Sequence, residues 1–140
     1  CIANKDQATV AHIGDTRLYH LRNNGILRRT KDQTELQKLL DEKVLTKARG
    51  KKYYRKNILL SVMTANREYE LQTTSFTLEQ GDRLLFSTDG AHSLVTVREI
   101  RDISVDSNTI VNFVKNLKSL IESKDIKDDY SVIGYEVKNE

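Results

Sequence analysis

Short alternating or apolar stretches, separated by turn residues, fill the first third of the chain and restrict it to an antiparallel arrangement. Residues 8–13 (A-T-V-A-H-I) and 16–21 (T-R-L-Y-H-L) have the β-branched content or the alternation that is typical of strands. Residues 23–25 (N-N-G) tolerate a positive φ and predict a hairpin turn, from which residues 26–29 return as the partner strand. With a short first strand over residues 1–4, the chain is predicted to begin as a meander.

A helix is predicted after the meander. Thr34 can cap it, because a threonine hydroxyl accepts a hydrogen bond from a backbone N–H of the first turn. Its apolar residues recur at helical spacing and form one stripe: Leu36, Leu39, Leu40 and Val44. The next stretches carry weaker signals. Residues 47–55 have no clear period and predict a mobile basic connector, whereas residues 57–63 are apolar enough for a short buried helix or strand.

Strands return in the second half of the chain. Residues 70–78 alternate and are rich in threonine, and residues 79–82 (E-Q-G-D) form the turn that follows. Residues 83–87 (R-L-L-F-S) are predicted to be a buried strand that ends at residues 88–90 (T-D-G). A closing strand is predicted over residues 130–137.

Two helices precede that closing strand, a short one over residues 96–103 and a longer one over residues 109–123. The longer helix has the clearest apolar stripe in the chain: Ile110, Phe113, Val114, Leu117, Leu120 and Ile121. Because strands and helices are grouped rather than alternating along the chain, the fold class is α+β, with layered sheets and helices.

Composition limits the class of protein. The chain has 140 residues, which is the length of one domain, and it is 38% hydrophobic and 31% charged, as in globular proteins. No apolar run is long enough to span a membrane. The single cysteine excludes an internal disulfide and a thiolate zinc site. Nothing resembles a secretion leader, so we expect a cytoplasmic location, although the chain begins with Cys1 rather than Met.

The net charge of +3 raises the question of nucleic-acid binding. Lysine and arginine are spread along the chain except in residues 47–56, and such basic runs are commonly solvated faces. Tryptophan is absent, so a base-stacking platform is poorly supplied. The sequence therefore does not predict a nucleic-acid partner.

Aspartates stand at the ends of three predicted strands. Asp15 follows Gly14, Asp89 precedes Gly90, and Asp128 lies just before the closing strand. Carboxylates gathered at one sheet edge are ligands that Mg²⁺ and Mn²⁺ prefer. Aspartates at strand ends are also common turn and cap residues, and spacing alone leaves both interpretations open. The three histidines (His12, His20 and His92) are expected to be structural or surface residues.

Five segments carry a resemblance to a known family. They are residues 14–19 (G-D-T-R-L-Y), 30–34 (T-K-D-Q-T), 56–59 (K-N-I-L), 81–90 (G-D-R-L-L-F-S-T-D-G) and 128–133 (D-D-Y-S-V-I). In this order they resemble the motifs G-D-S-R-x-Y, T-x-D-H-S/T, R-N-x-L, G-D-x-L-L-L-C-S-D-G and D-N-x-T/S-V-I of PPM-type (type 2C) metal-dependent serine/threonine phosphatases. The segments cover nearly the whole chain.

The resemblance implies an α-β-β-α sandwich, in which two antiparallel sheets pack face to face with helices outside. It also implies two Mg²⁺ or Mn²⁺ ions at one edge and a metal-activated water that attacks phosphoserine or phosphothreonine of a protein substrate. Asp89 and Asp128 fall on metal-ligating aspartates of the family. Asp15 falls on an aspartate that is associated with an additional, weaker metal position.

The family's D-G-x-G-G-H motif, whose aspartate bridges the two metals, does not occur in this chain. Without that bridging carboxylate, two adjacent cations would repel each other. We therefore expect residues 1–140 to be the C-terminal portion of one phosphatase domain, with N-terminal strands missing, the metal site incomplete and no catalytic residue assigned. Exposed sheet edges would allow self-association. Ser93 and Gln33 also depart from the family pattern, in which Asp and His are usual.

Two alternatives stay open at this point. A phosphatase-derived binding or regulatory module would keep the sheets without catalysis, as Ser93 and Gln33 suggest. A basic nucleic-acid-binding β domain would bind with a steep salt dependence.

Overall fold

The computed structural model describes residues 1–4, 6–66 and 68–138, which form two antiparallel sheets and five helices. The strands are β1 (Ile2–Ala3), β2 (Gln7–His12), β3 (Arg17–Arg22), β4 (Gly25–Arg28), β5 (Gln72–Thr77), β6 (Arg83–Ser87) and β7 (Val132–Glu136). The helices are α1 (Glu35–Asp41), α2 (Lys47–Gly50), α3 (Asp89–His92), α4 (Val97–Val105) and α5 (Ile110–Glu122).

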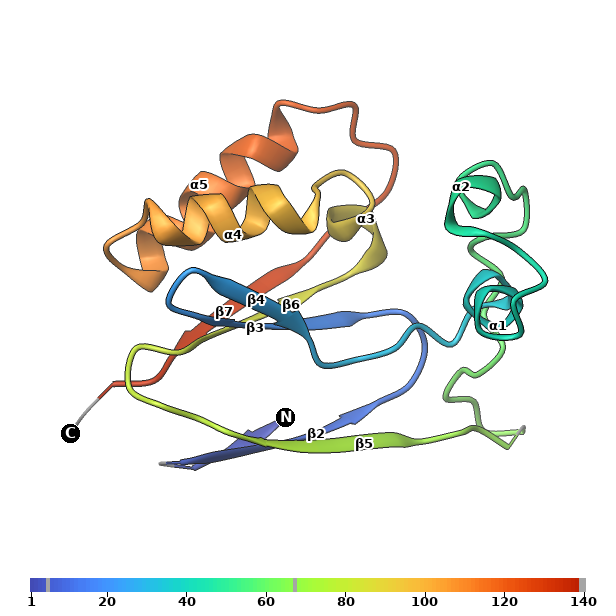
Figure 1. Cartoon of the computed structure of the whole chain (residues 1–140), viewed down its shortest axis with the longest axis horizontal. Helices are drawn as coiled ribbons and strands as arrows, with labels where there is room; N and C mark the ends of the chain where they lie inside the picture. The colour runs from blue at the N-terminus through green and yellow to red at the C-terminus, as the bar shows by residue number, and fades with distance from the viewer. Residues whose placement is uncertain (5, 67, 139–140) are drawn as a thin grey trace.

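The two sheets lie face to face (Figure 1). The smaller sheet has the order β1-β2-β5 and the larger one the order β4-β3-β6-β7, and every strand pair is antiparallel. Helices α4 and α5 cover the outer face of the larger sheet. The predicted α+β class with layered antiparallel sheets is therefore confirmed. No helix in the described part of the chain is long and apolar enough to cross a membrane.

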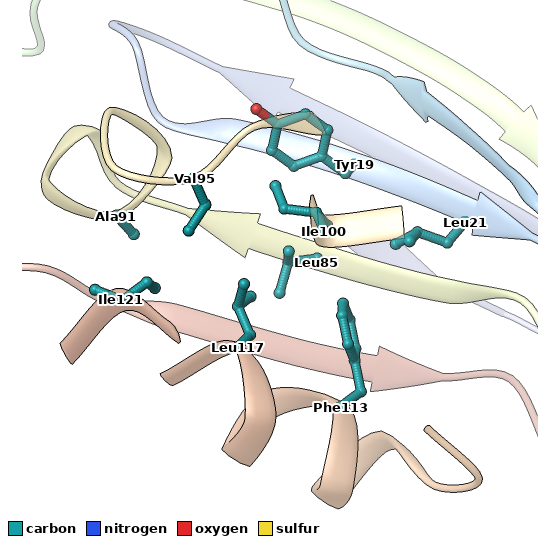
Figure 2. Packing of buried hydrophobic residues seen from close by; sticks show 9 residues of the cluster. All are labelled: Tyr19, Leu21, Leu85, Ala91, Val95, Ile100, Phe113, Leu117 and Ile121. Carbon is teal, nitrogen blue, oxygen red and sulfur yellow. The ribbon is translucent and has the colours of Figure 1, made fainter. Parts of the chain in front are cut away.

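Strand β3 is buried on both faces because it lies between two cores. Tyr19 and Leu21 point toward the helices, where they join a cluster that α5 supplies with Phe113, Leu117 and Ile121 (Figure 2). A second cluster fills the space between the sheets: Ala8, Val10, Leu18, Phe76, Leu78, Leu84 and Val137. The alternation of residues 16–21 thus positions one strand against both layers.

The region between β4 and β5 corrects three predictions. Residues 47–55 were predicted as a connector, but residues 47–50 form α2, because the Thr46 hydroxyl caps the Arg49 N–H. Residues 57–63 were predicted to be buried, yet Ile58, Leu60 and Met63 are exposed, and the stretch contains only an isolated bridge. Val44 lies outside α1 and is also exposed. Local apolar content does not show whether another layer will cover a segment.

A buried carboxylate connects the two sheets. Asp82 is 1% exposed, although it lies in the turn between β5 and β6. Its oxygens accept hydrogen bonds from Arg22 Nε and Nη2 and from the Glu79 N–H, and His20 Nε2 is also 2.8 Å from Oδ2. Burial alone would raise the pKa of Asp82, but the hydrogen bonds from Arg22, Glu79 and His20 outweigh it and lower the pKa.

Replacing this carboxylate should destabilise the fold strongly. Asp82→Asn places an amide N–H₂ group against donors, and loss of one partner of a buried ion pair costs about 3 kcal/mol or more. We expect urea denaturation at pH 7 to show that loss in the free energy of unfolding. Asp125→Asn is the matched control, because the Asp125 side chain is 85% exposed, and it should change the free energy by less than about 0.5 kcal/mol.

The stability of the parent chain and that of Asp82→Asn should also depend differently on pH. A carboxylate whose pKa is lowered by folding contributes stability that is present above its unfolded pKa of about 3.9 and is lost as the pH falls through the folded value. The stability difference between the parent chain and Asp82→Asn should therefore shrink below about pH 4. A difference that stays constant down to about pH 2 would contradict the role assigned to Asp82.

Candidate metal and phosphate site

The three aspartates singled out from the sequence line one cavity of about 610 Å³. Asp15 lies in the turn after β2, Asp89 is the first residue of α3, and Asp128 lies in the segment before β7. The fold thus brings to one cavity three residues that are separated by as many as 113 positions, 15 to 128, in the sequence. Basic side chains line the same cavity: Arg17, Arg28, Lys56 and Lys127.

Close backbone packing joins the segments that carry Asp89 and Asp128. A Cβ atom at Gly90 would lie 2.2 Å from the carbonyl oxygen of Asp129, so only glycine fits at this position. On the other side, the Thr88 N–H donates to the Ser131 carbonyl and the Ser131 N–H donates to the Thr88 hydroxyl. The D-G sequence after β6 is therefore required by a contact with the segment before β7.

A separate set of hydrogen bonds positions Asp15. Gly14 has a φ of +91°, which favours glycine, and its N–H donates to the buried side-chain amide of Gln33 over 2.7 Å. The same amide donates to the Glu70 carbonyl over 2.8 Å. From α3, His92 Nε2 lies 3.0 Å from the Asp15 carbonyl oxygen, which accepts its N–H. Gln33, a departure from the family pattern, is thus a buried bridge between the Asp15 turn and the chain before β5.

The charged groups of the cavity shift one another's pKa values. Burial, followed by the charges of Asp89 and Asp32, raises the pKa of Asp15. Asp32 has the opposite shift. Burial would raise its pKa, but hydrogen bonds from Arg17 at 3.0 and 2.6 Å, with a further contribution from Arg28, lower it. Burial and the charge of Arg17 lower the pKa of His92, so the imidazole is neutral at pH 7.

These carboxylates supply only part of a cation site. One oxygen of Asp89 accepts the Gly90 N–H, and one oxygen of Asp128 accepts the Asp129 N–H, which leaves the second oxygen of each aspartate available. Among the described residues, no three acidic, histidine or cysteine side chains lie close enough together to hold a metal ion. The described residues therefore do not fit a complete dinuclear centre.

From the sequence, the histidines are expected to be structural or surface residues, but no helix is predicted at the position of α3. His20 and His92 have structural contacts, with Asp82 and Arg29 in one case and with the Asp15 carbonyl in the other. The short helix α3 and the bridging role of Gln33 were not predicted. Both depend on partners distant in sequence, so no local pattern signals them.

Known proteins resemble the chain in sequence and in structure, although no protein-family model matches it. The serine/threonine phosphatase Stp of Listeria welshimeri is 30% identical over 125 residues, which cover 89% of this chain and 46% of that protein. The protein phosphatase PhpP of Streptococcus pneumoniae is 30% identical over 122 residues, with coverage of 82% and 50%.

Two solved structures have the same arrangement. The Mycobacterium tuberculosis serine/threonine phosphatase PstP matches with a TM-score of 0.88 at 25% identity, covering 99% of this chain and 57% of that chain. The catalytic domain of PstP in complex with 2 manganese ions matches with a TM-score of 0.80 at 25% identity, with coverage of 99% and 56%.

The sandwich of antiparallel sheets, with aspartates at one edge, has the architecture of a phosphatase domain. The chain belongs to the PPM-type serine/threonine phosphatase family. It spans about half the length of the curated relatives that it matches.

A methyl group at Gly90 should disturb this cavity. Gly90→Ala forces the contact with the Asp129 carbonyl apart, and steric conflicts of this kind typically cost 1–3 kcal/mol. We expect that loss in the free energy of unfolding, together with shifted amide resonances in residues 128–131. Ser93→Ala, an exposed change in the same cavity wall, should leave both unchanged. An unperturbed 128–131 segment in Gly90→Ala would refute the packing argument.

Proposed function

We propose that the chain is the C-terminal part of a Mg²⁺- or Mn²⁺-dependent protein serine/threonine phosphatase domain. The observation that carries the proposal is the cavity in which Asp15, Asp89 and Asp128 meet, since each belongs to a segment that resembles a family motif. The cavity contains both carboxylates, which suit divalent cations, and basic side chains, which suit a phosphate group. The proposed substrate is a phosphoserine or phosphothreonine protein.

The aspartates have different proposed roles. Asp89 and Asp128, on two segments in direct contact, would be the metal ligands that this part of the domain contributes. Asp15, whose carboxylate lies near that of Asp89, would belong to an additional and weaker cation position. In the complete domain, the cations would supply Lewis-acid chemistry and an activated water. The manganese ions named for PstP support a metal-dependent parent domain.

The isolated chain is proposed to be inactive. Its sequence lacks the D-G-x-G-G-H segment, and with it the carboxylate that would separate two cations. The alternative, a non-catalytic module derived from a phosphatase, has less support because the relatives compared above are named as phosphatases. A cytoplasmic location and self-association through exposed sheet edges stay predictions.

The first test is hydrolysis of a phosphothreonine peptide by the 140-residue chain with added Mn²⁺. We expect no turnover above that of Asp89→Asn, because half of the ligand set is absent. Turnover that depends on Asp89 would show that the chain completes a metal centre by itself and would overturn the proposed inactivity.

The second test concerns the parent protein, whose coding sequence upstream of Cys1 should contain a D-G-x-G-G-H segment. The longer product should hydrolyse the peptide with Mn²⁺, and Asp89→Asn should reduce kcat/KM by at least about tenfold. Asp125→Asn, an exposed change, is the matched control. An upstream sequence without the motif would favour the module instead, whereas full activity of Asp89→Asn would refute the assignment of Asp89.

A further inference from the structure

A second, smaller cavity of about 180 Å³ lies at one end of the space between the two sheets. Its walls come from the end of β2, the beginning of β5 and the segment that follows β4, which leaves the larger sheet on its way to α1 (Figure 1). The polar side chains that matter for its chemistry are His12, Arg28, Arg29, Lys31, Gln72 and Thr74.

His12 is buried in this wall without a hydrogen-bond partner. It is 8% exposed, and neither Nδ1 nor Nε2 has a partner among the described residues. Its neighbour across the sheet is Gln72, which lines the same cavity. Buried polar groups are nearly always hydrogen-bonded, so an imidazole with two unpaired nitrogens beside a cavity indicates a missing partner.

Arg29 brings a positive charge that no carboxylate in the described part of the chain neutralises directly. Its guanidinium lies 4.2 Å over the Phe76 ring and donates to His20 Nδ1 over 2.8 Å. Because arginine only donates, His20 Nδ1 is the acceptor in this contact. Burial and the charge of Arg22 lower the pKa of Arg29, which is the expected effect on a cation with little compensation.

The remaining charges in the wall have the same sign. Arg28 and Lys31 also line the cavity, whereas their acidic partners, Asp32 and Asp41, line other cavities instead. No described carboxylate contributes to the wall. The wall thus combines an unpaired imidazole with the basic residues Arg28, Arg29 and Lys31, of which Arg28 and Lys31 are paired with carboxylates outside it. The space that it encloses is several times the volume of about 30 Å³ that one water occupies.

We propose that this cavity, which we call the interlayer anion site, binds a small tetrahedral oxyanion of the phosphate class. His12 donates one N–H to the oxyanion, and Arg29 provides the charge. The Thr74 hydroxyl adds a donor, and Arg28 and Lys31 add charge by turning from Asp32 and Asp41 toward the anion. Charge-assisted hydrogen bonds from arginine to phosphate oxygens are among the strongest in proteins.

The test is a titration of the 140-residue chain with sodium phosphate in excess EDTA, so that no metal can mediate binding. Saturable binding with a dissociation constant on the order of 1 mM is expected, measured by the imidazole ¹⁵N shifts of His12. Phosphate at about ten times that constant should also raise Tm, because the anion binds the folded state. The matching chloride titration corrects for ionic strength.

Variants separate a specific site from general basicity. His12→Leu removes the donors and an unpaired buried polar group, so it should fold while weakening binding by at least about tenfold. Lys31→Gln, at a side chain that is 54% exposed, should weaken binding without loss of fold. Arg98→Gln, whose side chain is 83% exposed on α4, is the charge-matched control and should leave the affinity within about twofold.

Two further titrations identify the source of the oxyanion. A phosphothreonine peptide is compared with inorganic phosphate and with the same peptide unphosphorylated. If free phosphate alone shifts His12, the site takes the free ion, and if the phosphopeptide does so at lower concentration, the site takes a phosphorylated segment. The proposal is overturned if phosphate leaves the His12 resonances unchanged, or if Arg98→Gln weakens binding as much as His12→Leu does.

Discussion

The positions of both cavities depend on the hydrogen bonds that the buried carboxylate of Asp82 accepts. It holds Arg22 and His20 of β3 against the turn that leads from one sheet to the other. Four donors satisfy a charge that would otherwise be very costly to bury, and they fix where β6 begins. Since β6 ends five residues later at the segment that carries Asp89, the register set at Asp82 determines which residue reaches the cavity.

The same network extends into the space between the sheets. His20 Nε2 is engaged with Asp82, so Nδ1 accepts from Arg29, and this holds the guanidinium over Phe76 between the sheets. An aspartate in the turn between the two sheets thus orients an arginine in the wall of the interlayer anion site. Networks of this kind are rigid because each member has only one arrangement that satisfies its neighbours.

The parts of the fold that could be predicted from sequence are those with a strong local period or a fixed turn chemistry. Residues 83–87 are β6 as predicted, and α5 buries the predicted Phe113, Leu117 and Ile121. The prediction that residues 57–63 are buried was wrong, because apolar content alone does not reveal whether another layer covers a segment. The roles of Asp82 and Gln33 could not be foreseen either, since their partners are up to 62 and 37 positions away.

The candidate site also combines features that the sequence predicts with features that only the folded chain reveals. The positions of Asp15, Asp89 and Asp128 at strand ends were visible in the sequence, whereas their meeting in one cavity required the family resemblance or the structure. The clash that excludes a side chain at Gly90 gives the D-G pair a physical reason that the motif alone does not supply.

Arg28 connects the two cavities, because it lines both and is paired with Asp32. The charge of Asp32 in turn raises the pKa of Asp15. A change in the pairing of Arg28 with Asp32 would therefore alter the electrostatic potential at Asp15. Within a partly buried region, such interactions are screened far less than on an open surface. An anion held beside Arg28 would compete with Asp32 for the same guanidinium. The electrostatics of the aspartate cavity therefore depend on what occupies the interlayer anion site.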